Sequence, residues 1–216
     1  MITVGITGPT GCGKTTFLRE IAARGGEIVD CDALYYELLK NDASLREALQ
    51  GAFGDIFLAD GTLDRKSLAA QVFSDQNALA KLNEIVFFHV GNAVAEKKRQ
   101  AEAAQRPIFA IDAINLIESG MAETCDQTVA VLAPKQIRLR RIMARDHLPE
   151  AAARARIDAQ KPDEFYRAGC RHILTNDKDL EAFQEKSRAL LNNITKEETH
   201  DERTKRRTSL PAEKRL

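Results

Sequence analysis

The sequence of 216 residues lacks any apolar run of the roughly 18 to 20 residues that a membrane-spanning helix needs. It also lacks a charge excess, because Lys plus Arg and Asp plus Glu both number 32. Without a basic excess, no overall field attracts nucleic acid or an anionic membrane. No signal-peptide pattern stands between Met1 and the first apolar segment. We therefore expect a cytoplasmic protein that has neither a membrane nor nucleic acid as a partner.

Cysteine is scarce and dispersed, which excludes two further classes of protein. The four cysteines are Cys12, Cys31, Cys125 and Cys170, and no two of them form a C-x-x-C pair. This spacing argues against both a zinc site and a disulfide framework. We expect all four to be free thiols.

What the sequence does contain is a phosphate-binding loop near its start. Gly8-Pro9-Thr10-Gly11-Cys12-Gly13-Lys14-Thr15 fits G-x-x-x-x-G-K-[ST] at every fixed position. The apolar run Ile2–Ile6 before it predicts a strand, and apolar residues at helical spacing follow it. The pattern therefore predicts a nucleotide-binding protein. A glycine-rich turn that contains a lysine by chance is the weaker alternative, because both flanking elements are present.

Each position of this loop has an expected role in binding ATP and Mg²⁺. Backbone N–H groups point at phosphate oxygens, and the dipole of the next helix adds positive potential; the residues expected to do this are Gly8, Gly11, Cys12 and Gly13. Lys14 is expected to contact the β- and γ-phosphates, and the hydroxyl of Thr15 to bind magnesium. Thr16 is placed to assist at the α-phosphate.

Cys12 has two readings. A thiol near a helix N-terminus and Lys14 can have a lowered pKa and react readily with oxidants. We hypothesise that oxidation of Cys12 blocks nucleotide binding. The alternative is that Cys12 is only a small residue at a variable position of the loop and has no chemical role.

The remaining pattern predicts an α/β fold with a doubly wound, five-stranded parallel sheet. Short apolar runs rich in β-branched residues alternate with longer helical patterns; the predicted strands are Ile2–Ile6, Glu27–Val29, Ile108–Ile111, Thr128–Leu132 and His172–Leu174. The length suits one domain. In such sheets the ligand lies beyond the carboxyl ends of the strands, so residues that end a strand are the candidates for chemistry.

Two long excursions interrupt this alternation, and a charged tail follows it. We expect a kinase domain over residues 1–194, with a helical substrate cap at about 33–103 and a lid at about 138–171. Arg138, Arg141 and Arg145 follow an i, i+3, i+7 spacing, so we expect them to share one helix face that repels itself unless anions lie there. Residues 195–216 have no apolar period, and we expect them to be disordered.

Phosphoryl transfer to a hydroxyl needs a carboxylate that orients the acceptor and receives its proton. Asp30 and Asp32 follow the second strand, beside the phosphate-binding loop as we expect the sheet to be ordered. We choose Asp32 as the base. For Asp30, a functional role and a role as helix N-cap are equally expected.

Asp112 ends an apolar strand. We expect it either to hold magnesium through water or only to cap the strand. Asn176, after the last strand, is expected to contact adenine or to shape a turn.

These features together resemble the dephospho-CoA kinase family from Ile2 to about Leu191. Besides the loop, the resemblance includes Asp30-Cys31-Asp32, Asp60–Arg65, Val72-Phe73, Leu82-Asn83, Asp112–Glu118, Arg141–Asp146, Ala159-Gln160 and Asn176-Asp177. It implies a P-loop NTPase fold of the adenylate-kinase-like type. It also implies transfer of the γ-phosphate of ATP to the ribose 3′-hydroxyl of dephospho-CoA, the last step of coenzyme A synthesis. By similarity, the base is Asp32 and the lid arginines are Arg141 and Arg145.

The sequence departs from the family pattern on the acceptor side. Tyr36 replaces an arginine, and Phe87 and Phe88 replace a His-Pro pair. Ile114-Asn115-Leu116 replaces the usual Pro-Leu-Leu. Two alternatives therefore stay open: another small-molecule kinase of the same fold, acting on a nucleoside or nucleotide, or a nucleotide-binding paralogue without transfer activity. A GTPase switch is disfavoured, because no D-x-x-G follows a strand and no N-K-x-D is present.

Overall fold

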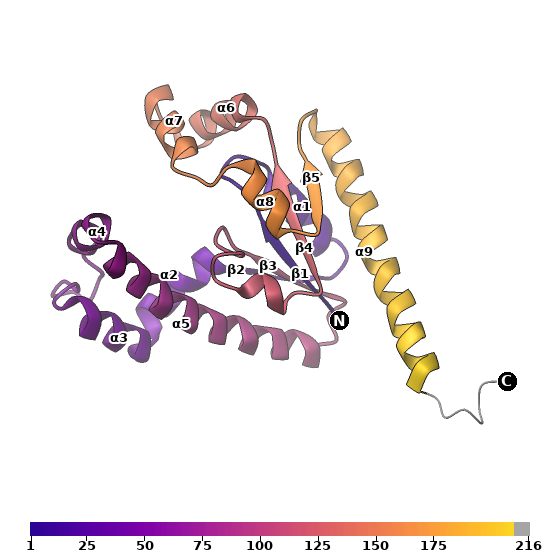
Figure 1. Cartoon of the computed structure of the whole chain (residues 1–216), viewed down its shortest axis with the longest axis horizontal. Helices are drawn as coiled ribbons and strands as arrows, with labels where there is room; N and C mark the ends of the chain where they lie inside the picture. Colours follow the sequence, from indigo (N-terminus) through magenta and orange to yellow (C-terminus); the bar gives the residue numbers. More distant parts are fainter. Residues whose placement is uncertain (210–216) are drawn as a thin grey trace.

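The computed structural model describes the backbone of residues 1–209 and the side chains of residues 1–196. Within these residues, one sheet is formed by β1 (Ile2–Thr7), β2 (Glu27–Asp30), β3 (Ile108–Asp112), β4 (Gln127–Leu132) and β5 (His172–Thr175). The strands are parallel and lie in the order β2-β3-β1-β4-β5. Helices cover both faces of this sheet (Figure 1). The prediction of a doubly wound, five-stranded parallel α/β sheet is confirmed.

One face of the sheet packs against α1 (Lys14–Ala22) and α9 (Leu180–Ser209), which contact each other. Successive side chains of a strand point to opposite faces, so Ile2, Val4 and Ile6 of β1 all join the same buried cluster. Phe17 of α1 and Phe183 of α9 complete it and are at most 1% exposed. This cluster fixes the start of α1, and therefore the loop before it, relative to the sheet.

The opposite face of the sheet carries a lobe of four helices, the α2–α5 lobe. It consists of α2 (Cys31–Asn41), α3 (Ala43–Phe53), α4 (Arg65–Ser74) and the long α5 (Gln76–Ala103). Val90 and Val94 of α5 pack with Phe109 and Ile111 of β3, which fastens the lobe to the sheet. The far part of the lobe has a core of its own, formed by Leu39, Leu45, Leu49, Phe53, Ile56, Leu68 and Val72.

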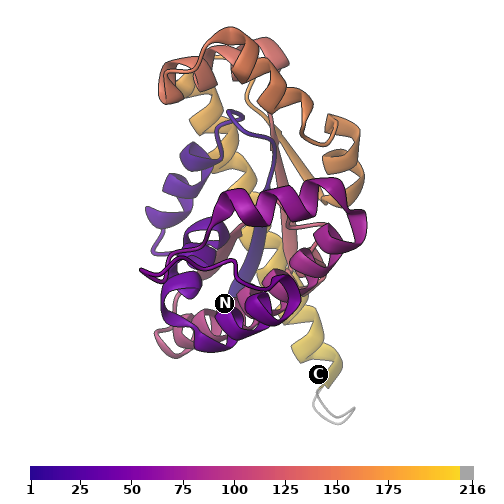
Figure 2. The same cartoon turned by 90° about the vertical axis from the view of Figure 1, so that its left-hand side faces the viewer.

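Three short helices follow β4: α6 (Lys135–Asp146), α7 (Glu150–Asp158) and α8 (Asp163–Gly169). Leu139 and Ile142 of α6 pack with Ala153 and Ile157 of α7 in a small separate cluster. Figures 1 and 2 both show the loop after β1 between the α6–α7 pair and the α2–α5 lobe. The two excursions expected from the sequence thus lie on either side of the phosphate-binding loop.

We expected residues 195–216 to be disordered or frayed, and the backbone of α9 continues as a helix to Ser209. Leu191 and Ile194 are fully buried, so the helix is packed on the domain up to the predicted boundary. Beyond it the sequence is rich in Glu, Lys and Arg, which favour helix even where no apolar face exists. The remainder of the predicted tail, residues 210–216, lies outside the described residues.

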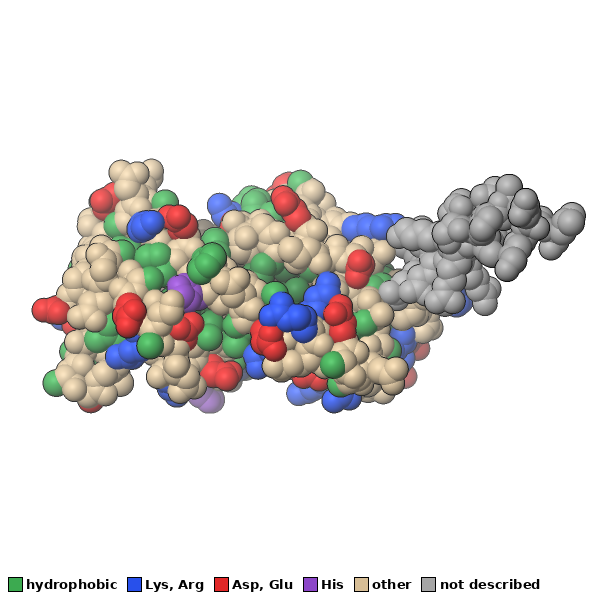
Figure 3. Space-filling view, turned by 90° about the horizontal axis from the view of Figure 1, so that it is seen from below, with side chains coloured by type: hydrophobic (Ala, Val, Ile, Leu, Met, Phe, Trp, Pro, Cys, Tyr) green, Lys and Arg blue, Asp and Glu red, His purple; other side chains and the backbone are tan. Residues whose placement is uncertain are grey.

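On the face seen in Figure 3, acidic and basic side chains of the described residues lie next to one another. Among those residues, no helix combines the length and the apolar character that a membrane span requires.

Candidate active site

The phosphate-binding loop connects β1 to α1 at the carboxyl end of the sheet. Its glycines have positive φ angles of 138° at Gly8, 78° at Gly11 and 104° at Gly13, which side chains rarely allow. A Cβ on Gly8 would lie 2.1 Å from the backbone oxygen of Val131, so the sheet itself leaves no room for one. No side chain caps the start of α1, where Gly13 is the N-cap. An uncapped helix start at the end of a glycine-rich loop fits an anion.

Lys14 is the cation of this loop, and its side chain extends back to the Gly8 oxygen. Its Nζ donates a hydrogen bond to the Gly8 oxygen at 3.1 Å and lies 4.0 Å from Oδ1 of Asp112. The side chain lines a cavity of about 750 Å³, whose wall includes Thr15, Asp32, Asp112, Arg141 and Arg145. The structure therefore brings together the predicted phosphate-binding, metal-binding, basic and acidic residues around one space.

Asp112 ends the strand next to β1, because β3 separates β2 from β1. In register it stands between Ile6 of β1 and Asp30 of β2. The expectation that the Asp30-Asp32 step lies directly beside the loop is therefore wrong in detail: the end of β3 comes between them. The sequence could not reveal this, since strand order depends on contacts between distant segments.

The carboxylate of Asp112 is buried without a full set of partners. Oδ1 accepts no hydrogen bond from any described residue. The pKa of Asp112 is raised from 3.8 to about 6, chiefly by burial and also by Asp30 and Asp32, although Lys14 lowers it. An orphaned carboxylate oxygen next to a phosphate site fits Mg²⁺ or the water bound to it. Among the described residues, no group of three or more acidic, His or Cys side chains is placed so that it could hold a metal ion.

We predict that Asp112→Asn stabilises the chain in the absence of nucleotide and magnesium. Since the pKa of Asp112 is about 6 in the folded chain and 3.8 ordinarily, the folded state holds this proton more tightly. Stability is therefore lost as the pH rises from about 4 to 6. The variant should gain about 1–3 kcal/mol in free energy of unfolding at pH 7, and much less at pH 4. Urea unfolding at both pH values measures this; equal gains would contradict the burial argument.

Asp30 and Asp32 have separate positions although only Cys31 lies between them. Oδ1 of Asp30 accepts hydrogen bonds from the backbone nitrogens of Asp32 at 2.9 Å and Ala33 at 3.0 Å. Asp30 is thus the N-cap of α2, one of the two roles expected for it. Asp32, in the first turn of α2, lines the cavity of the phosphate-binding loop. Its pKa is raised, first by loss of solvation and then by Asp30, while Lys14 lowers it.

Asp32 also borders a second cavity of about 220 Å³ between α2, α5 and the segment after β3. This acceptor-side cavity is mostly apolar, with two side-chain amides in its wall; its lining includes Cys31, Asp32, Tyr35, Leu82, Asn83, Val86, Phe87, Val90, Ala113, Ile114, Asn115 and Met121. Two of the departures from the family pattern, Phe87 and Asn115, line it. Tyr36 instead is half exposed beneath the Arg65 guanidinium, and Phe88 is 64% exposed.

The three arginines of α6 do not form the free cationic face expected from their spacing. Arg138 is buried, and its Nε donates to the Thr10 oxygen at 3.1 Å. Arg145 donates to Asp146 through two nitrogens, at 2.7 and 3.0 Å. Periodicity correctly placed them on one helix, but Arg138 and Arg145 already donate to oxygens of the protein, the Asp146 carboxylate among them. No sequence signal distinguishes a buried arginine from an exposed one here.

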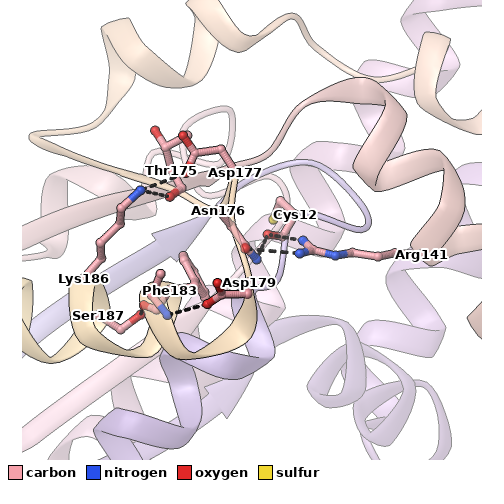
Figure 4. Close-up of polar contacts among 10 residues, drawn as sticks. Cys12, Arg141, Thr175, Asn176, Asp177, Asp179, Phe183, Lys186 and Ser187 are labelled. Carbon is pink, nitrogen blue, oxygen red and sulfur yellow. Dashed lines mark hydrogen bonds and ion pairs between the residues drawn. The ribbon is translucent and has the colours of Figure 1, made fainter.

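Arg141 and Asn176 contact the phosphate-binding loop from outside (Figure 4). Arg141 donates to the oxygens of Gly11 and Cys12, both at 3.3 Å, and to Oδ1 of Asn176 at 3.1 Å. Nδ2 of the buried Asn176 donates to the Cys12 oxygen at 2.9 Å. A Cβ on Gly13 would lie 2.3 Å from that Nδ2. Asn176 therefore packs against the loop, and its predicted contact with adenine remains a prediction.

The expected low pKa of Cys12 is wrong. The thiol is 1% exposed, and burial raises its pKa more than the nearby Lys14 and Arg138 lower it. Proximity in sequence to a helix N-terminus did not reveal that the thiol points into the core. The hypothesis of an oxidation-sensitive loop loses its basis, and the alternative of a small filling residue fits the structure. Cys12, Cys31, Cys125 and Cys170 are all free.

A parallel sheet with a phosphate-binding loop, flanked by two helical additions that border the nucleotide cavity, defines a P-loop kinase of small molecules. The dephospho-CoA kinase family model matches residues 2–182, and the chain belongs to that family. Kinases of this family use a nucleotide as phosphoryl donor and a small molecule as acceptor.

The chain is also similar to a curated relative and to solved structures. A dephospho-CoA kinase of Salinibacter ruber is 35% identical over 88% of this chain and 96% of its own length. A crystal structure of a Thermus thermophilus protein is 32% identical, with a TM-score of 0.74 over 89% of this chain and 97% of its own. The dephospho-CoA kinase from Campylobacter jejuni, 24% identical, shares the fold with a TM-score of 0.64 over 91% of this chain and 98% of its own.

Proposed function

We propose that the chain transfers the γ-phosphate of ATP to the ribose 3′-hydroxyl of dephospho-CoA. The observation that carries this proposal is the position of Asp32, which borders both the cavity of the phosphate-binding loop and the acceptor-side cavity. A carboxylate between a donor site and an acceptor site is suited to orient a hydroxyl toward the phosphate. Family membership supplies the identity of the acceptor. The cytoplasmic location expected from the sequence stays a prediction.

In this reaction Asp32 accepts the proton of the 3′-hydroxyl as the new O–P bond forms. The bond between the γ-phosphorus and the oxygen that bridges to the β-phosphate breaks, and ADP leaves. Lys14 stabilises the charge on the β- and γ-phosphates, and the backbone N–H groups of Gly11 and Gly13 donate to other phosphate oxygens. Arg141 and Arg145 border the same cavity and are proposed to face the phosphates when the site closes.

Thr15 and Asp112 are proposed to hold Mg²⁺, which neutralises phosphate charge when bound. Oδ1 of Asp112 accepts no hydrogen bond from the described residues and lies 4.0 Å from Nζ of Lys14, which supports this assignment. We propose that the α2–α5 lobe is the substrate cap and that residues 138–171 act as the lid. The lobe borders both cavities, whereas the lid segment borders the cavity of the phosphate-binding loop. Exclusion of water by the lid would limit wasteful hydrolysis of ATP.

The proposal is tested by following ADP release from Mg·ATP with dephospho-CoA, adenosine or shikimate added separately. We expect stimulation by dephospho-CoA alone over the reaction without an acceptor. Stimulation by adenosine or shikimate instead would indicate another small-molecule kinase, an outcome for which Phe87 and Asn115 in the acceptor-side cavity provide a structural reason. No stimulation by any of them would indicate a nucleotide-binding protein without transfer activity.

A further inference from the structure

Three consecutive carbonyl groups of the phosphate-binding loop are held from outside the loop. The Thr10 oxygen accepts from Nε of Arg138 at 3.1 Å. The Gly11 and Cys12 oxygens accept from Arg141, and the Cys12 oxygen also from Asn176. Arg138 and Arg141 come from α6, whereas Asn176 follows β5 (Figure 4 shows Arg141, Asn176 and Cys12). Two segments distant in sequence therefore fix the path of the loop.

Arg138 and Gln160 together bind the backbone carbonyl and the backbone N–H of Thr10. Oε1 of Gln160 accepts from the Thr10 nitrogen at 3.1 Å and from the guanidinium of Arg138 at 3.1 Å. Asp163 lies 3.9 Å from another nitrogen of that guanidinium. The Arg138 side chain is only 3% exposed. A buried arginine is retained at a large desolvation cost unless its hydrogen bonds are made, and here each side of the guanidinium meets an oxygen.

The backbone of α6 also packs directly on the loop. A Cβ on Gly11 would lie 3.0 Å from the Arg138 oxygen and 3.2 Å from its Cα. Both the backbone and the guanidinium of Arg138 therefore contact the phosphate-binding loop. This geometry leaves little freedom for the loop to change its path while Arg138 keeps its hydrogen bonds.

Holding these carbonyls outward determines where the loop's N–H groups point. In a planar trans peptide, the C=O of one residue and the N–H of the next point in opposite directions. Fixing the Thr10 carbonyl therefore directs the Gly11 N–H to the other side, and fixing the Cys12 carbonyl does the same for Gly13. The Thr10 and Cys12 nitrogens are used within the protein, by Gln160 and by the Pro9 oxygen. Gly11 and Gly13 are left to donate into the cavity.

We infer that Arg138 and Gln160 form a positioning pair for the triphosphate of ATP. Neither touches the nucleotide. They keep the Thr10 segment in the conformation that binds phosphate before ATP arrives, so that binding does not have to order the loop. The inference rests on the proposed function only in that the loop binds ATP, and it assigns roles to two residues outside the family's proposed catalytic set.

Arg138→Met in the full chain tests this pair. We expect the Kd for Mg·ADP, measured by calorimetry, and the KM for ATP to rise about tenfold, the size of one lost hydrogen bond to a charged group. The KM for dephospho-CoA should stay within about twofold. Gln160→Leu should raise the Kd similarly. In the double variant, the fold-increase in Kd should be smaller than the product of the two single increases. Arg140→Met, which changes an exposed arginine of the same helix, is the matched control.

A residue that only supports the fold would give a different pattern. It would lower kcat through a smaller folded fraction and leave the Kd for Mg·ADP unchanged, and that result would overturn the inference. Arg138→Lys, which keeps the charge but cannot reach both oxygens, should recover part of the affinity. If Arg138→Met does not fold, wild-type affinity in the folded Gln160→Leu variant would overturn it equally. ADP binding needs no acceptor, so failure of the proposed transfer would not be confused with failure of the pair.

Discussion

Asp32→Asn is expected to lower kcat by about a hundredfold or more while leaving the affinity for Mg·ATP nearly intact. Asparagine has the same shape but cannot take the proton of the acceptor hydroxyl. Asp32 faces the cavity from the first turn of α2 and is not the cap of that helix, so the exchange should not disturb the fold. Initial rates of ADP formation with dephospho-CoA give kcat, and calorimetry with a non-hydrolysable ATP analogue gives the affinity.

Asp30→Asn is the matched control, because it removes a carboxylate only two residues away. Asparagine is as good an N-cap as aspartate, so this variant should keep kcat within about threefold. The pH profile adds an independent check. Because loss of solvation and Asp30 raise the pKa of Asp32, the acid limb of kcat should lie above the ordinary carboxyl range and disappear in Asp32→Asn. A rate close to wild type in Asp32→Asn would remove the residue from its proposed role.

Lys14→Ala is expected to reduce kcat/KM for ATP by about a thousandfold, since it removes a preorganised charge at the transferring phosphate. Unlike Asp32→Asn, it should weaken nucleotide binding as well as transfer. Lys14 is also the cation that lowers the pKa of the buried Asp112. Its loss should therefore raise the pH at which Asp112 ionises, which narrows the pH range in which a magnesium ligand is available.

Steady-state rates and Mg·ADP titrations separate the two effects of Lys14→Ala. Lys40→Ala, an exposed lysine at the end of α2, controls for the loss of one positive charge. If Lys14→Ala bound Mg·ADP as tightly as the control, the loop would not hold the phosphates in the way proposed.

Much of the fold could be predicted because its signals are local. The loop has a fixed spacing, and the strands are short apolar runs between helical patterns; both depend on neighbouring residues alone. The family resemblance, which rested on the order of such motifs, is confirmed by the family match over residues 2–182. The cavity that joins Lys14, Asp32 and Asp112 followed from the rule that ligands lie at the carboxyl ends of parallel strands.

What could not be predicted depends on contacts between distant segments. The insertion of β3 between β1 and β2 places Asp112, not Asp30, next to the loop. Helical spacing put Arg138 and Arg145 on one helix, but only the fold shows that Thr10 and Gln160 enclose the first and that Asp146 pairs with the second. The buried thiol of Cys12 is a similar case, since its environment is formed by the sheet and not by its sequence neighbours.

We propose that the phosphate-binding loop delivers the γ-phosphate to a hydroxyl held beside Asp32, and not to water. Phosphorus NMR of a reaction containing Mg·ATP, dephospho-CoA and the full chain distinguishes the two acceptors. We expect a new phosphomonoester resonance, scalar-coupled to the ribose 3′ proton, that grows in step with ADP. Formation of inorganic phosphate with ADP and no phosphomonoester would contradict it.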